Sequence, residues 1–84
     1  MSYARRTDTT HAEIMAALRA MGWKMKDTHS LPKFVDAVGF RPRDGVVLFE
    51  FKSGRGKLRP SQQELIDEGW PVRVLRTAAD AARA

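Results

Sequence analysis

The sequence contains no cysteine, so disulfide bonds and thiolate zinc sites are excluded, and nothing in it indicates an oxidising compartment. It has only two histidines, His11 and His29, which we consider too few for a zinc cluster. No apolar run approaches the roughly 20 residues of a membrane-spanning helix. The first residues also lack the apolar centre of a signal peptide. We therefore expect a soluble intracellular protein with no membrane partner.

The chain is short and basic. Its 84 residues are enough for one domain, whose core must be simple: a single sheet with helices packed against it. Lysine and arginine total 15 against 10 acidic residues, which gives a net charge of +5. A basic balance favours polyanionic partners, nucleic acid above all, although many small basic proteins bind none.

The apolar pattern predicts alternating helices and strands in the order αβββαβα. Residues 1–9 are polar and are expected to form a loose arm, which leaves 10–84 as the single domain. Thr10 and Glu13 fit a capping box, and Gly22 fits a helix end, so the first helix is expected between Thr10 and Gly22. The remaining elements are expected at 23–26, 35–40, 46–52, 60–68, 72–75 and 77–84.

The strands at 35–40 and 46–52 are separated by five turn-forming residues and should form a hairpin. A register symmetric about Arg43 places Asp36 opposite Glu50, and Lys52 shares the face of Glu50. Two opposed carboxylates repel each other, whereas a divalent cation between them would be attracted, and such oxygen ligands suit Mg²⁺ or Mn²⁺. The alternative is a solvated surface network in which Lys52 pairs with one of the acids.

Two features flank the hairpin. The basic loop 53–57 follows Lys52 directly, so it could hold phosphates. In the second predicted helix, Gln62 shares the inward face of Leu65 and Ile66, and an inward amide needs a hydrogen-bond partner, which a catalytic pocket would supply. Trp23 and Trp70 are expected in the core or an interface rather than as base-stacking platforms.

Several segments together resemble a known family. They are FVD at 34–36, VLFEFKSG at 47–54, LRPSQQ at 58–63 and VRVLRT at 72–77, with thirteen residues between the two acids. These segments resemble the PD-(D/E)XK nuclease superfamily and, within it, the small phage-type VRR-Nuc proteins, which are similar in fold to Holliday-junction resolvases. The resemblance implies an α/β (α+β) fold with a restriction-endonuclease-like αβββαβ core, in which helices flank a mixed central sheet.

The resemblance also implies roles for individual residues. Asp36, Glu50 and the backbone carbonyl of Phe51 would bind Mg²⁺ or Mn²⁺, and Lys52 would orient the attacking water and stabilise charge at the phosphate. Glu13 matches a helix acid that completes the metal site in relatives, although it could be only the second half of the capping box. Gln62 matches the glutamine that follows the catalytic lysine.

The predicted function is therefore metal-dependent endonuclease cleavage of DNA. The residues expected to hold the DNA backbone are basic: Arg41, Arg43, Arg55, Lys57 and Arg59, with Arg5 and Arg6 in the arm. We expect a preference for branched DNA such as junctions or flaps, a homodimer with two sites, and a cytoplasmic location in a bacterium or phage-infected cell. The alternatives are a DNA-binding or accessory module that does not cut, and a toxin or restriction-like subunit.

Overall fold

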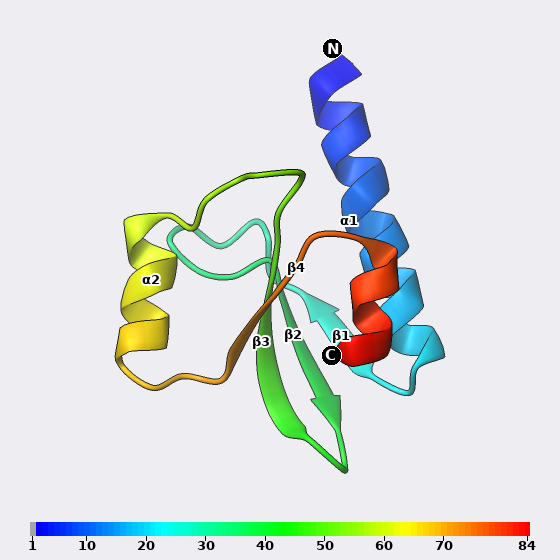
Figure 1. The fold of residues 1–84 in the computed structure, drawn as a ribbon, viewed down its shortest axis with the longest axis vertical. Helices are drawn as coiled ribbons and strands as arrows, with labels where there is room; N and C mark the ends of the chain where they lie inside the picture. Colours follow the sequence, from blue (N-terminus) through cyan, green and yellow to red (C-terminus); the bar gives the residue numbers. More distant parts are fainter. Residues whose placement is uncertain (1) are drawn as a thin grey trace.

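The computed structural model describes the backbone of residues 2–84 and the side chains of residues 10–84. Within this range the chain forms an α+β fold with a four-stranded mixed sheet (Figure 1). The elements in chain order are α1 (Ser2–Ala20), β1 (Lys24–Asp27), β2 (Ala37–Arg41), β3 (Gly45–Phe51), α2 (Pro60–Asp67), β4 (Val72–Leu75) and the 3₁₀ helix η1 (Ala78–Arg83). The predicted order of helices and strands is confirmed.

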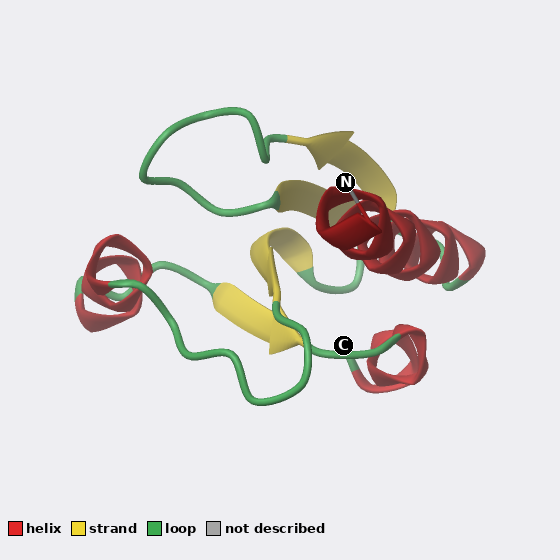
Figure 2. Cartoon of the chain, turned by 90° about the horizontal axis from the view of Figure 1, so that it is seen from above, coloured by secondary structure: helices red, strands yellow, loops and turns green. Residues whose placement is uncertain are grey.

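The strands lie side by side in chain order. The pairs β1–β2 and β2–β3 are antiparallel, whereas β4 pairs parallel to β3 after the chain has crossed through α2. Helices α1 and η1 pack against each other on one side of the sheet, and α2 lies on the other side (Figures 1 and 2). Among residues 2–84, neither α1 nor any shorter helix combines the length and apolar character needed to cross a lipid bilayer.

The predicted start of the first helix is wrong. Helix α1 begins at Ser2, so residues 2–9 continue the helix instead of forming a loose arm, and Thr10 lies inside the helix and cannot be its N-cap. Nothing before Thr10 breaks a helix, because residues 2–9 include neither glycine nor proline. The helix end agrees with expectation: Gly22 has a φ of 95°, and the Trp23 N–H bonds the Leu18 carbonyl at 3.1 Å.

The hairpin has the predicted register. Val38 pairs with Leu48 and Phe40 pairs with Val46 across β2 and β3. The alternation of side chains in β3 therefore directs Val47 and Phe49 to the side of α1 and η1, and Leu48 and Glu50 to the other side. This register decides which charged side chains meet at the end of the hairpin.

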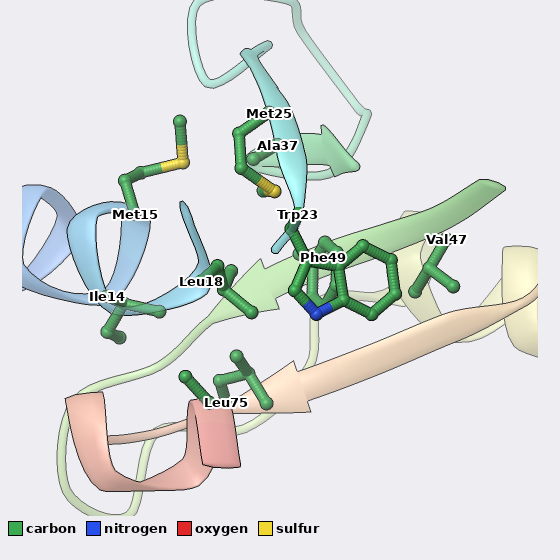
Figure 3. Packing of buried hydrophobic residues seen from close by; sticks show 10 residues of the cluster. Ile14, Met15, Leu18, Trp23, Met25, Ala37, Val47, Phe49 and Leu75 are labelled. Carbon is green, nitrogen blue, oxygen red and sulfur yellow. The ribbon is translucent and has the colours of Figure 1, made fainter. Parts of the chain in front are cut away.

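The core lies between the sheet and the α1–η1 layer. Phe49 and Leu18 are fully buried there, and the ring of Trp23 meets the ring of Phe49 edge-on with the two centroids 5.0 Å apart (Figure 3). Trp23 thus belongs to the core as expected, whereas Trp70 is 53% exposed. Gly39 of β2 lies against this cluster, since a Cβ added there would come within 2.7 Å of the Phe49 ring.

Candidate functional site

Asp36 stands directly before β2 and is turned onto the neighbouring strand. Its N–H donates to the carbonyl of Phe49 at 3.0 Å, and its Oδ2 accepts a hydrogen bond from the N–H of Phe51 at 2.8 Å. The ladder of paired residues ends at Ala37 and Phe49, and the negative charge of Asp36 raises the pKa of Glu50, so the two carboxylates lie close together. The backbone of β3 therefore holds the Asp36 carboxylate beside Glu50.

Glu50 is a buried acid, with only 3% of its surface exposed. Its Oε2 lies 3.2 Å from the Lys52 amine, but its Oε1 is buried and has no hydrogen-bond partner among the described residues. Burial raises the pKa of Glu50, and the negative charge of Asp36 raises it further, while Lys52 acts in the opposite direction. An unpartnered oxygen on a buried acid is costly, so the arrangement needs a compensating partner.

The structure thus brings Asp36, Glu50 and Lys52 together at one end of the hairpin. Lys52 is two residues beyond Glu50, so the alternation of strand side chains directs both to the same face. The Lys52 side chain is also largely buried, at 12% exposure. A solvated surface network is therefore not what this part of the chain forms.

Gln62 is buried as expected, but its carbonyl has a different partner. The Gln62 Oε1 accepts a hydrogen bond from the Arg59 N–H at 2.9 Å, which caps the first turn of α2. Arg59, at the N-cap, has an extended backbone and supplies no side-chain hydrogen bond of its own to the cap. No hydrogen bond among the described residues joins Gln62 to the acids or to Lys52.

Glu13 is not brought to the acid pair. It lies on an exposed part of α1, and the charged groups that act on the pKa of Glu50 are Asp36 and Lys52. Its alternative role as part of a capping box is also wrong, because the helix continues upstream of Thr10. The capping signature failed here because the same spacing of residues occurs inside helices as well as at their ends.

The predicted DNA-contacting cations differ in their surroundings. Arg43, Arg55, Lys57 and Arg59 are exposed, whereas the side chains of Arg5 and Arg6 lie outside the described part. Arg41 is held against the protein: it bonds Asp44 at 2.7 Å, the Met21 and Ala84 carbonyls, and stacks on Trp23 at 4.4 Å. The hydrogen bond from Arg41 is the main reason that the pKa of Asp44 lies below its ordinary range.

Sequence reasoning missed Arg76 at the end of β4. Its guanidinium donates from Nη1 to the carbonyls of Gly54 and Gly56, each at 2.9 Å, and so ties the basic loop 53–57 to β4. No local pattern predicts this contact, because it joins residues 20 and 22 positions apart. The loop that carries Arg55 and Lys57 is therefore fixed next to Lys52.

From the sequence we consider the two histidines too few for a zinc cluster, and this reasoning missed the cluster that His11 and His29 form with Asp27. The two histidines each bond one oxygen of the Asp27 carboxylate, His11 at 3.0 Å and His29 at 2.5 Å. Burial acts to raise the pKa of Asp27, but the hydrogen bonds and charges of the histidines outweigh it and hold the value below its ordinary range. No signal in the sequence spacing could have found this cluster, because α1 and the β1–β2 connection meet only in the folded chain.

The burial of Glu50 predicts a pH-dependent stability. Because its pKa is raised in the folded protein, folding is most favourable below the ordinary value of 4.5 and weakens as the pH rises through the raised value. Glu50→Gln should remove this loss, since its amide can donate to Asp36. At pH 7, without divalent ions, we expect about 1 kcal/mol of stabilisation, or roughly 4–8 °C in Tm.

Thermal unfolding followed by circular dichroism between pH 4 and pH 8 measures this effect. The exposed Glu64 provides the matched control, and Glu64→Gln should leave the pH profile of Tm unchanged. If the Tm of Glu50→Gln changed with pH in parallel with that of the wild type, burial of the Glu50 carboxyl would not be the cause of the pH dependence.

Comparison with known proteins assigns the chain neither a family nor a function. No protein-family model matches the chain, and no curated protein or solved structure matches it either. The function is therefore inferred from the geometry of the site.

Proposed function

We propose that this chain is a metal-dependent endodeoxyribonuclease of the PD-(D/E)XK type. The observation that carries the proposal is the buried Glu50 oxygen without a partner, beside a second carboxylate and an amine. Such a cluster costs folding free energy, and a bound cation would offset that cost. The order of one helix, three antiparallel strands, a helix and a parallel strand supports a restriction-endonuclease-like core.

The chemistry of the donors fits a hard divalent cation. Asp36 and Glu50 offer carboxylate oxygens and no sulfur or nitrogen, which is the donor set that Mg²⁺ and Mn²⁺ prefer. The carbonyl of Phe51, the residue between Glu50 and Lys52, is the third ligand that we propose. When bound, the ion would polarise the scissile phosphate and lower the pKa of a bound water.

The protein groups would position the reactants. The Asp36 carboxylate is already oriented by the Phe51 N–H, so little reorganisation is needed for it to act as a ligand. The Lys52 ammonium, 3.2 Å from Glu50, would stabilise the negative charge that develops on the phosphate and would orient the attacking water. Because Glu50 and Lys52 are both largely buried, these electrostatic effects are stronger than they would be in bulk water.

The exposed cations would hold the DNA backbone. Arg55 and Lys57 lie on the loop that Arg76 fixes beside the acid pair, and Arg43 and Arg59 are also exposed. Contacts with phosphates position DNA without reading its sequence, so we propose recognition of DNA shape, such as a junction or flap. A homodimer would present two sites to two strands of such a substrate.

Incubation with labelled linear, flap and four-way-junction DNA tests the proposal. We expect cleavage products with Mg²⁺ or Mn²⁺ and none with EDTA, with the branched substrates cut faster than the linear duplex. Binding of the same substrates in gel-shift assays without any metal-dependent cleavage would replace the proposal with a non-catalytic DNA-binding module.

A further inference from the structure

A second cluster of ligating side chains lies beside the acid pair, since its His11 and the acid-pair residue Asp36 line the same small cavity. It consists of His11 on α1, Asp27 at the end of β1, and His29 two residues later. The Nε2 of His11 is 3.0 Å from one Asp27 oxygen, and the Nδ1 of His29 is 2.5 Å from the other. One donor atom from each residue lies within 4.8 Å of the other two.

The cluster is held in place by its surroundings. The imidazole of His11 is mostly buried and packs edge-on against Phe51, with the ring centroids 5.0 Å apart. The backbone N–H of His29 donates to Asp27 at 3.0 Å, which fixes the turn that brings the second imidazole back, and the two imidazole centroids are 5.2 Å apart. Donor atoms positioned this way need little movement to share an ion.

We infer that His11, Asp27 and His29 form a binding site for a transition-metal dication of the Zn²⁺, Co²⁺ or Ni²⁺ class. Two imidazole nitrogens and one carboxylate oxygen are ligands that these ions favour and that Mg²⁺ does not. Around a tetrahedral zinc, ligand atoms at 2.0–2.1 Å stand roughly 3.3 Å from one another. The 3.0 Å between His11 and Asp27 is close to this value, and one donor atom from each of the three residues lies within 4.8 Å of the other two.

Three protein ligands leave one position of a tetrahedral ion open to water. The side chains of Asp27 and His29 are 43% and 60% exposed, so an ion can enter from solvent. A bound ion would join α1 to the end of β1 and the connection that follows it, since His11 and Asp27 are 16 residues apart in sequence. The site differs in chemistry from the acid pair, and the inference does not depend on the proposed nuclease activity.

Metal binding to the chelator-stripped full chain tests the inference. Isothermal titration with Zn²⁺ should show one site per chain, and Co²⁺ should give the visible d–d absorption of a nitrogen–oxygen site. His29→Gln and Asp27→Asn should each weaken Zn²⁺ binding at least about tenfold, because ligand loss costs no less than loss of an outer hydrogen-bond partner. The matched control is Asp67→Asn, which removes an exposed aspartate far from the cluster in sequence.

Two further measurements distinguish a metal site from a hydrogen-bonded network without a metal. Zn²⁺ should shift the imidazole NMR signals of both histidines in the wild-type protein, whereas Mg²⁺ should not, and this result does not require a variant that folds. Glu50→Gln should retain Zn²⁺ binding, which separates this site from the acid pair. Unchanged imidazole signals with Zn²⁺, or an affinity equal to that of the wild type in His29→Gln, would show that the cluster is a hydrogen-bonded network only.

Discussion

Lys52→Ala is expected to slow metal-dependent DNA cleavage by about 10²- to 10³-fold at saturating substrate, with DNA affinity changed much less. The reason is that the Lys52 ammonium lies 3.2 Å from Glu50 and, in the proposed mechanism, stabilises the charge that develops on the phosphate rather than holding the duplex. Asp36→Asn should have an effect at least as large, because it removes the charge of a proposed metal ligand whose orientation the Phe51 N–H fixes. Single-turnover kinetics on the junction substrate measures both losses.

The controls for this prediction are matched in charge. Lys24→Ala removes an exposed lysine of β1, and Asp67→Asn neutralises an exposed aspartate of α2. Both should leave the single-turnover rate within about twofold of the wild type, in line with the small effects of most surface substitutions. If Lys24→Ala and Lys52→Ala lost activity equally, the effect would reflect net charge and DNA affinity, and Lys52 would have no catalytic role.

Gly39→Val should cause a large loss of stability. A Cβ at this position would come within 2.7 Å of both the Phe49 ring and the Met25 sulfur, and within 3.2 Å of the Trp23 ring. Met25 can bend away, but Phe49 is fully buried and meets Trp23 edge-on, so the rings cannot move independently. Overpacking of this kind costs about 3 kcal/mol, or roughly 12–24 °C in Tm for a domain of this size.

Thermal and urea unfolding should show stability losses that increase with the size of the side chain at position 39. Gly39→Ala is expected to lose less stability than Gly39→Val, and the exposed Val46→Thr should stay within about 0.5 kcal/mol of the wild type. The double variant with both Gly39→Ala and Phe49→Leu should lose less stability than the sum of the losses of the two single variants. The reason is that the smaller leucine leaves space for the added methyl group. Strict additivity of the two changes would argue against their contact.

The acid pair could be anticipated from the sequence because the hairpin is local. The short turn of residues 42–44 sets the register, and the alternation of strand side chains then determines which residues share a face. The contribution of helix residues to the site was harder to predict. Glu13 and Gln62 both belong to helices, and the rotation and position of a helix relative to a sheet depend on packing across the whole core.

The start of α1 shows the limit of local signals in another way. A capping pattern at Thr10 and Glu13 predicts a helix start only when the preceding residues leave the helical conformation, and residues 2–9 do not. The predicted and observed ends of β1, β2 and β3 differ by one or two residues, because the ends of the ladder depend on what the neighbouring strand can pair with, whereas β4 has the predicted ends.

The order of elements, the hairpin register and the convergence of Asp36 with Glu50 were determined by the sequence alone, since each follows from side-chain period and short turns. Only the tertiary structure decided that Glu50 is buried with an unpartnered oxygen, that Arg76 fixes the basic loop, and that two distant histidines share Asp27. The physical reason is that burial and long-range contacts depend on how helices pack on the sheet. No local periodicity encodes that arrangement.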